Sequence, residues 1–170
     1  ANTVVDVTAP AGDVQYNSDW STKAPAPTGI LVSSSNNVLD NVTVNFNAPT
    51  TTGSYPTVNG LHIGAVNGAI SNNTVRDSKV TVKGTNYAYG INVGNAKDTT
   101  LENVEVNVES DYYADAIQLF DADGITMTGT ANAKATTQAY GIYSTAMGTG
   151  ASQNIDATGL DVTVEAPDAT

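Results

Sequence analysis

The chain has 170 residues, which suits one domain, and 14% of its residues are charged whereas 40% are hydrophobic. Its formal net charge is −11, and its six Lys and Arg residues are scattered, which excludes the basic stripe that binding to DNA, RNA or anionic membranes requires. The absence of cysteine excludes disulfides and thiolate metal sites. No apolar run approaches the ~18 residues needed to span a bilayer.

Residues 1–28 come first and fit no repeat. Val4 to Thr8 alternates like one strand, whereas residues 12–27 are rich in Pro, Ser and Ala and contain Trp20. The terminal units of repeat proteins are atypical because they cover the open end of the core. We therefore expect residues 1–28 to form an N-terminal partial coil and a cap, with Trp20 plugging the core rather than serving as a ligand platform.

A short phrase then recurs along the chain: a small residue, an aliphatic residue, any residue, and usually another aliphatic residue. Its five copies are 31, 30, 26 and 25 residues apart. The copies are Gly29 to Val32, Gly60 to Ile63, Gly90 to Val93, Ala116 to Leu119, and Gly141 to Ser144. Such self-similarity is the signature of a repeat architecture.

A second phrase follows each copy of the first. Leu39 to Phe46 matches Leu101 to Val108 closely, and three looser copies complete the set. The looser copies are Val75 to Val82, Ile125 to Asn132, and Ile155 to Val162. The sixth position is β-branched or apolar in all five copies, as Val44, Val80, Val106, Thr130 and Leu160.

Strand and turn formers dominate the composition, and runs of helix formers are absent, so the fold class is predicted to be all-β. One repeat cannot bury its apolar side alone, but stacked repeats can. We therefore predict a right-handed parallel β-helix, or β-solenoid, of about five to six coils over residues 29–170. Residues 165–168 follow the last strand without an evident cap, so we expect these coils to be a fragment of a longer solenoid.

Period-two alternation within the phrases predicts which side chains face the core. Ile91 and Val93 are expected to point inward and Asn92 outward. Val104, Val106 and Val108 are likewise expected to point inward. Asn41 and Asn103 follow a leading aliphatic residue, where a corner needs a residue that tolerates the left-handed region.

The same alternation predicts two outward columns on the strands of the first phrase. The small column is Gly29, Gly60, Gly90, Ala116 and Gly141, and the mixed column is Leu31, His62, Asn92, Gln118 and Tyr143. Small residues beside aromatic, imidazole and amide groups suit a sugar or a protein partner, so the mixed column is the predicted binding face. The alternative is that the small column only permits close packing.

Tyrosines cluster in the second half of the chain. Tyr89 and Tyr140 precede the repeated glycine with the parity of the inward isoleucine, so we expect them at a corner of the core. Tyr112 and Tyr113 fall in a predicted loop and are candidates for ligand contact, with covering of apolar surface as the alternative. His62 is the only histidine, is expected to be exposed, and has no evident catalytic partner.

Asp121 and Asp123 precede Gly124 and resemble the opening of a calcium loop, because spaced carboxylates before a tight turn supply oxygen ligands. No Glu closes the loop at the twelfth position, so an EF-hand is incomplete. The alternatives are a calcium ion at Asp121 and Asp123, or a solvated acidic turn. No other cofactor is predicted.

The phrases Ala88 to Val93 and Ala139 to Ile142, each followed by a Leu-x-Asn-Val-x-Val type strand, resemble the passenger domains of bacterial autotransporters. The Asn/Thr/Gly-rich, cysteine-free composition is similar as well, and the resemblance covers residues 29–165. It implies export across the outer membrane and a role in adhesion, aggregation or biofilm formation at the cell surface. The family has no fixed functional motif that could be carried over.

The sequence thus predicts a bacterial cell-surface or secreted adhesin module without enzymatic activity. Its expected partners are a host surface protein, a glycan or a second copy of itself, bound through an outer face of the solenoid. The alternative is a carbohydrate-active β-helix enzyme or phage tailspike module, since Asp121 and Asp123 could face the same way as a pair of carboxylates.

Overall fold

A computed structural model describes residues 2–13, 15–16, 22–24, 26–65, 68–146 and 151–167. Nearly all regular structure in these residues is β-strand, as the composition predicts. None of them belongs to a helix, so the described part of the chain has no helix that could cross a membrane. Trp20, the predicted core plug, lies outside the described residues.

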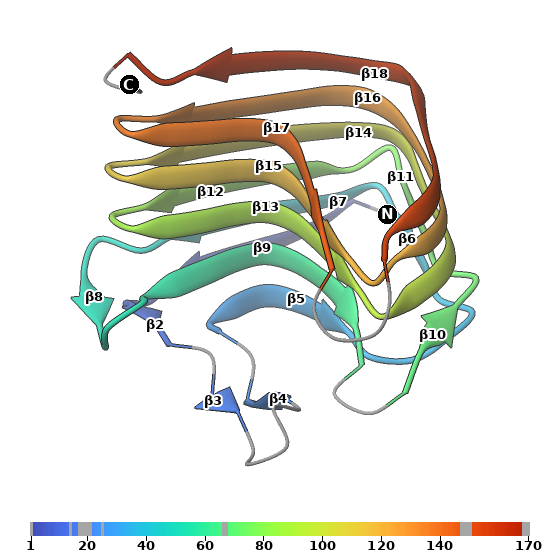
Figure 1. Cartoon of the computed structure of the whole chain (residues 1–170), viewed down its shortest axis with the longest axis horizontal. Helices are drawn as coiled ribbons and strands as arrows, with labels where there is room; N and C mark the ends of the chain where they lie inside the picture. Colours follow the sequence, from blue (N-terminus) through green and yellow to red (C-terminus); the bar gives the residue numbers. More distant parts are fainter. Residues whose placement is uncertain are drawn as a thin grey trace.

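The larger sheet has nine strands, and its long strands pair in parallel in chain order (Figure 1). These are β1 (Thr3–Thr8), β7 (Val42–Asn47), β12 (Lys79–Gly84), β14 (Ala96–Ser110), β16 (Asp123–Ala135) and β18 (Gln153–Glu165). The short strands β10 (Ile70–Ser71) and β11 (Thr74–Arg76) pair with the first half of β14, and β6 (Val38–Asp40) pairs with β11. The strand predicted at Val4 to Thr8 is therefore confirmed as β1.

The second sheet has seven strands, five of which carry the first repeated phrase. These five are β5 (Thr28–Val32), β9 (Thr57–Gly64), β13 (Tyr87–Gly94), β15 (Tyr113–Phe120) and β17 (Gln138–Thr145). The short strands β2 (Ala11–Gly12) and β8 (Thr51–Thr52) lie at its edge, while β3 (Gln15–Tyr16) and β4 (Thr22–Ala24) form a separate antiparallel pair. The chain alternates between the two large sheets, so each repeat adds a strand to both (Figure 1).

The register of the seven-stranded sheet is the one that the sequence repeat predicts. Ile30, Leu61, Ile91, Ile117 and Ile142 occupy successive paired positions. The spacing of 31, 30, 26 and 25 residues is therefore a stacking interval. Loops between strands absorb the differences in length, which leaves the paired positions aligned.

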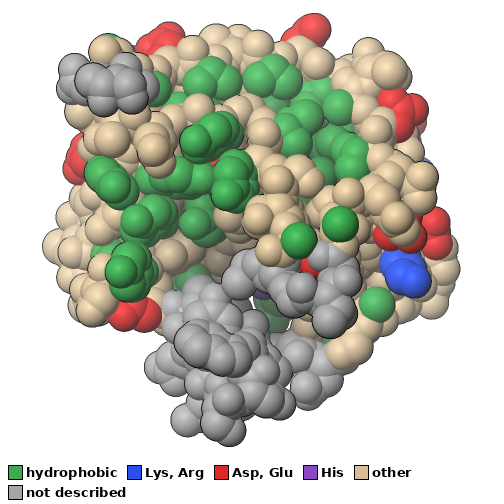
Figure 2. All heavy atoms as spheres, viewed as in Figure 1, with side chains coloured by type: hydrophobic (Ala, Val, Ile, Leu, Met, Phe, Trp, Pro, Cys, Tyr) green, Lys and Arg blue, Asp and Glu red, His purple; other side chains and the backbone are tan. Residues whose placement is uncertain are grey.

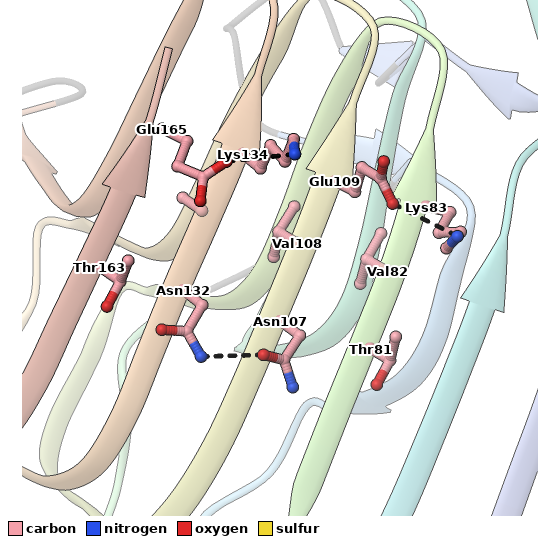
Figure 3. A pocket seen from close by; sticks show the side chains of 11 residues that line it. Thr81, Val82, Lys83, Asn107, Val108, Glu109, Asn132, Lys134, Thr163 and Glu165 are labelled. Carbon is pink, nitrogen blue, oxygen red and sulfur yellow. Dashed lines mark hydrogen bonds and ion pairs between the residues drawn. The ribbon is translucent and has the colours of Figure 1, made fainter. Parts of the chain in front are cut away.

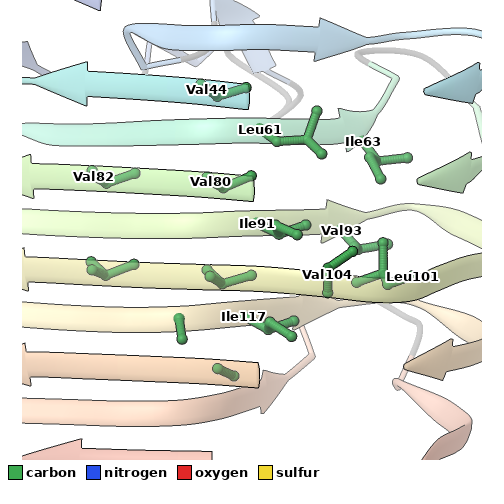
Figure 4. Close-up of a cluster of buried hydrophobic side chains, with 14 of the residues drawn as sticks. Val44, Leu61, Ile63, Val80, Val82, Ile91, Val93, Leu101, Val104 and Ile117 are labelled. Carbon is green, nitrogen blue, oxygen red and sulfur yellow. The ribbon is translucent and has the colours of Figure 1, made fainter. Parts of the chain in front are cut away.

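Aliphatic side chains from both sheets meet in one core (Figure 4). Leu61 and Ile91 of the seven-stranded sheet and Val80 and Val106 of the nine-stranded sheet are at most 2% exposed. Each fully buried aliphatic side chain contributes about 1.5–3 kcal/mol relative to exposure. The predicted inward direction of Ile91 and Val106 is confirmed.

Corners of the chain carry the predicted asparagines. Asn41 and Asn103 have φ values of 56° and 51°, and Asp77, between them in the stack, has 49°. Asn and Asp tolerate the left-handed region better than other residues with side chains, because their short polar groups bond locally. Asn103 Nδ2 donates to Asp77 Oδ1 at 2.7 Å, which joins neighbouring corners.

The small column was predicted to face outward, and this is wrong. A Cβ placed on Gly60 would collide with Val80 across the core, and one on Gly90 would collide with Val106. Ala116, in the same column, is fully buried. The ladder pairs the residues on either side of Gly90 but not Gly90 itself, so two consecutive residues face the core there and strict alternation fails.

The same interruption reverses the expected direction of two tyrosines. Tyr89 pairs with Asp115, and Asp115 pairs with Tyr140, in a column that faces away from the core. Tyr140 is 37% exposed. The prediction that Tyr89 and Tyr140 stack at a corner of the core is therefore wrong.

The last two copies of the second phrase are also out of register in the sequence alignment. Val106 pairs with Ala131, not Thr130, and Ala131 pairs with Val162, not Leu160. Irregularities in the ladder near Gly129 shift the pairing. Gly129 has φ of 119°, which a residue with a side chain rarely adopts, so the irregularity is built into the sequence.

Candidate functional site

The predicted mixed column forms on the outer side of the seven-stranded sheet. Leu31, His62, Asn92, Gln118 and Tyr143 pair consecutively across β5, β9, β13, β15 and β17. Its exposure falls from 45% at Leu31 to 6% at Asn92. The sequence therefore predicted the column correctly, while its binding role stays a prediction.

His62 is more buried than predicted. Gly64 lies beside it, and the Phe120 ring lies where a side chain on Gly94, the partner of Gly64 on the next strand, would be. The Phe120 and His62 rings meet edge-to-face with centroids 6.5 Å apart. Burial lowers the pKa of His62 to about 4, so the ring is neutral at pH 7, and its Nδ1 has no hydrogen-bond partner among the described residues.

Amide side chains link the column across the strands. Asn92 Nδ2 donates to Gln118 Oε1 at 2.8 Å and to Asn59 Oδ1 at 3.2 Å. Gln118 Nε2 continues the series by donating to Asp115 Oδ2 at 3.3 Å. This chain of amides fixes the side chains of three neighbouring strands and ends on a carboxylate.

Asp115 is the only Asp, Glu, Lys or Arg in the strands of the seven-stranded sheet. Its side chain is fully buried between Tyr89 and Tyr140 in the column, and its Oδ1 has no partner among the described residues. Burial raises the pKa of Asp115 to about 7, although hydrogen bonds from Tyr113 and Gln118 oppose the shift. Asp115 was not among the predicted site residues, and its signal was one carboxylate in a column that otherwise holds no charge.

Tyrosine rings form a continuous array beside the amides. Neighbouring centroids are 5.2–6.5 Å apart, from the pair Tyr140–Tyr143 to the pair Tyr55–Tyr87. The members are Tyr55, Tyr87, Tyr89, Tyr112, Tyr113, Tyr140 and Tyr143. Figure 2 shows hydrophobic side chains gathered on this side of the molecule, over the starts of β13, β15 and β17.

The two tyrosines predicted for ligand contact belong to this array. Tyr112 precedes β15 and is 42% exposed. Tyr113 is the first residue of the strand and is partly buried, so its predicted place in a loop is wrong. Burial among the rings and the neighbouring Asp115 carboxylate raise the pKa of Tyr113. We call the array and the mixed column, together with Asn59 and Asp115, the tyrosine face.

A second outward surface, which the sequence analysis did not single out, lies on the nine-stranded sheet (Figure 3). Its three columns cross β12, β14, β16 and β18. They are Lys79, Glu105, Thr130 and Asp161, then Thr81, Asn107, Asn132 and Thr163, then Lys83, Glu109, Lys134 and Glu165. We call this surface the charged face.

Ion pairs and amide bonds run along these columns. Lys83 pairs with Glu109 at 3.3 Å, and Lys134 pairs with Glu165 at 3.1 Å, all four side chains being more than half exposed. Asn132 Nδ2 donates to Asn107 Oδ1 at 2.9 Å. A furrow of about 440 Å³ lies between the amide column and the Lys/Glu column, and Val82 and Val108 line it as well. The signal in the sequence was Lys-x-Thr-x-Lys followed by Glu-x-Asn-x-Glu in successive strands.

Of the two aspartates predicted to hold calcium, Asp123 is the first residue of β16 and Asp121 lies two residues before it. Asp123 accepts hydrogen bonds from Asn154 at 2.7 Å and from Gln153 at 3.0 Å, which lower its pKa. Asp121 occupies a left-handed corner with φ of 48°. Among the residues the structure describes, no three His, Cys, Asp or Glu side chains are grouped to hold a metal ion.

Comparison with protein-family models, curated proteins and solved structures finds no match. A function must therefore rest on what the two faces can do chemically. The tyrosine face offers rings and amides with a single buried carboxyl, whereas the charged face offers paired opposite charges on a broad strand surface.

Proposed function

We propose that the chain forms a right-handed parallel β-helix of five to six coils and acts as an adhesion module on the bacterial cell surface. In this proposal it adheres by pairing with a second copy of itself through the charged face. The parallel registers and the resemblance to autotransporter passenger domains support the fold and the location.

The observation that carries the proposal is the self-complementarity of the charged face. A half-turn about an axis parallel to the strands, between β14 and β16, brings β12 opposite β18 of the partner and β14 opposite β16. Lys83 then meets Glu165 of the partner subunit, and Glu109 meets Lys134 of the partner subunit. In this isologous contact, each charged side chain of the third column has an oppositely charged neighbour in its own chain and another in the partner subunit.

The other two columns agree with the same arrangement. Lys79 meets Asp161 of the partner subunit, and Asn107 meets Asn132 of the partner subunit. No two like charges come together at any of the opposed positions. Complementary charge of this kind sets orientation and specificity more than raw affinity.

The opposite orientation is disfavoured by the same residues. In that orientation the half-turn is about an axis between the two faces that runs along the direction in which the strands stack. It places the first column of one copy opposite the third column of the other. Lys79 then meets Lys83 of the partner subunit, and Glu105 meets Glu109 of the partner subunit. Like-charge contacts disfavour this arrangement. We therefore propose the first arrangement, which we call antiparallel because the stacking directions of the two copies are opposite.

The size of the face predicts a weak contact. Four strands about 4.8 Å apart, with six residues each, cover roughly 400 Å² per partner. This is about half of a standard interface, so a single pair should dissociate readily. Many such modules on two facing surfaces would gain avidity, which suits adhesion between cells.

A carbohydrate-active enzyme is the alternative function, and one observation favours it. Asp115 is a buried carboxyl with a raised pKa, which is typical of catalytic groups. Glycoside hydrolysis, however, usually needs two carboxylates a few ångströms apart, and Asp115 is the only one in its sheet. Release of reducing ends from polysaccharides by the purified protein would support the enzyme over the adhesin.

Sedimentation velocity over a concentration series tests the proposed pairing. The protein should form a reversible dimer, and Lys134→Glu should weaken it about tenfold, because two symmetric contacts with Glu109 of the partner subunit become repulsive. Tyr143→Ala, on the opposite face, is the matched control and should leave the dimer unchanged. A strictly monomeric protein, or a dimer that tolerates Lys134→Glu, would contradict the proposal.

A further inference from the structure

The tyrosine face contains buried polar atoms that lack partners. Asn92 Oδ1 and Asp115 Oδ1 have no hydrogen bond among the described residues, and both side chains are more than nine-tenths buried. His62 Nδ1, in the column of Asn92, is a buried atom without a hydrogen bond among the described residues as well, although the His62 side chain as a whole is only partly buried. Each such group costs about 1–3 kcal/mol when unsatisfied, so three in adjoining columns call for an explanation.

These atoms share a chemical preference. Asn92 Oδ1 accepts hydrogen bonds, and so does Asp115 Oδ1 when the carboxyl is ionised. The neutral His62 ring accepts at one nitrogen as well. A ligand that satisfies them must therefore supply donors, and hydroxyl groups are the natural source.

Aromatic rings stand next to the acceptors. Tyr140 follows Asp115 in one column, Tyr143 follows Gln118 in the other, and their ring centroids are 5.2 Å apart. Tyrosine offers an apolar face together with a polar edge. A pyranose ring has the matching character, with C–H groups on its faces and hydroxyls around its rim.

The charge on this face restricts the class of sugar that can bind. No Lys or Arg occurs in the strands of the seven-stranded sheet, and the only formal charge is that of Asp115. The whole chain carries −11. A uronic or sialic acid would find no cation there and would be repelled, whereas a neutral sugar would not.

We propose that the tyrosine face is a binding site for neutral saccharides. The sugar ring stacks on Tyr140 and Tyr143 and donates hydroxyl hydrogens to Asn92 and Asp115. Tyr140 is 37% exposed and pairs directly beside Asp115, so a sugar on its ring lies next to the carboxyl. This site is separate from the charged face and is independent of pairing.

Isothermal titration with matched oligosaccharides tests the site. Neutral galacto-, gluco- and manno-oligosaccharides are compared with oligogalacturonate, which differs from its neutral counterpart by carboxylates. We expect at least one neutral series to bind, and oligogalacturonate to bind at least tenfold more weakly. Equal or tighter binding of oligogalacturonate would overturn the proposal, as would binding of none of these sugars.

Two substitutions locate the site. Tyr143→Ala removes a stacking ring, and Asn92→Ala removes an acceptor, so each should weaken binding about tenfold or more. Asn132→Ala removes an amide of the charged face and should leave sugar binding unchanged. Thermal unfolding identifies variants that fail to fold, and Tyr140→Phe, which keeps the ring, should retain most of the affinity.

Two further outcomes count against the site. Binding that survives Tyr143→Ala and Asn92→Ala together places the sugar elsewhere and overturns the assignment. Preference for a proline-rich peptide over all sugars would show that the rings serve protein recognition instead. Neither result bears on the charged face, whose pairing is measured by sedimentation without sugar.

Discussion

The two outward faces share one core but carry opposite kinds of side chain. The seven-stranded sheet presents tyrosines and amides with a single buried carboxyl, Asp115. The nine-stranded sheet presents Lys and Glu in alternation, exemplified by Lys83 and Glu109. Inward positions are set by packing on both sheets, so only the outward columns differ, and that difference points to two separate interactions.

Among the outward positions, Asp115 should have the largest effect on the free energy of unfolding. Its pKa is raised from 3.8 to about 7, so the folded protein holds a proton that the unfolded chain releases between those values. Stability should therefore fall as pH rises from about 4 to about 7, by up to about 4 kcal/mol, and level off above. Denaturant unfolding as a function of pH checks this, and Asp115→Asn should abolish the decline.

Asp123 provides the contrasting control. Its pKa is lowered by hydrogen bonds from Asn154 and Gln153, so its contribution is present above pH 4 and is lost on acidification. Asp123→Asn should therefore alter stability with the opposite pH dependence. If Asp115→Asn and Asp123→Asn gave parallel pH profiles, the contrast between a buried and an exposed carboxyl would be wrong.

Gly90 tests the inward direction of the small column. Gly90→Ala forces a methyl group against Val106 and the Ala116 carbonyl, so we expect a loss of about 1–3 kcal/mol in the free energy of unfolding. Gly12→Ala, where the new methyl would meet neighbours at an ordinary 3.5 Å, should change stability by about 0.5 kcal/mol or less. Equal effects in chemical unfolding would mean that the column faces outward after all.

Lys134 should show the smallest effect on folding. Its ion pair with Glu165 joins two side chains that are each 60% exposed, so Lys134→Ala should cost at most about 1 kcal/mol. The loss should shrink further in 1 M salt, where exposed charges are screened. A larger loss in thermal unfolding would make the charged face a stability element rather than a surface free to exchange partners.

The repeat could be predicted from the sequence wherever the strand pairing is regular. The column from Leu31 to Tyr143 and the left-handed corners at Asn41 and Asn103 follow from spacing and residue type alone. Alternation failed at Gly90, because the ladder skips that residue, and the reversed direction of Tyr89 follows from this.

The charged face and Asp115 could not be found from one strand. Lys83 is informative only together with the charged residues that stack beside it on the next strands. Register shifts near Gly129 hide that stacking in the later repeats of the sequence. Asp115 is conspicuous only once its neighbours in space are known to be tyrosines. Both depend on contacts between residues about 25 or more positions apart.

The most direct measurement uses a variant with the Lys/Glu column reversed: Lys83→Glu, Glu109→Lys, Lys134→Glu and Glu165→Lys. This variant keeps the net charge, the neighbouring ion pairs and the self-complementarity of the column. In sedimentation velocity with one species fluorescently labelled, it should dimerise with itself as the original chain does. Mixed pairs should be at least tenfold weaker, because Lys83 would then meet the lysine substituted at position 165 of the partner. Mixed pairs as strong as either homodimer would contradict the antiparallel charged-face contact.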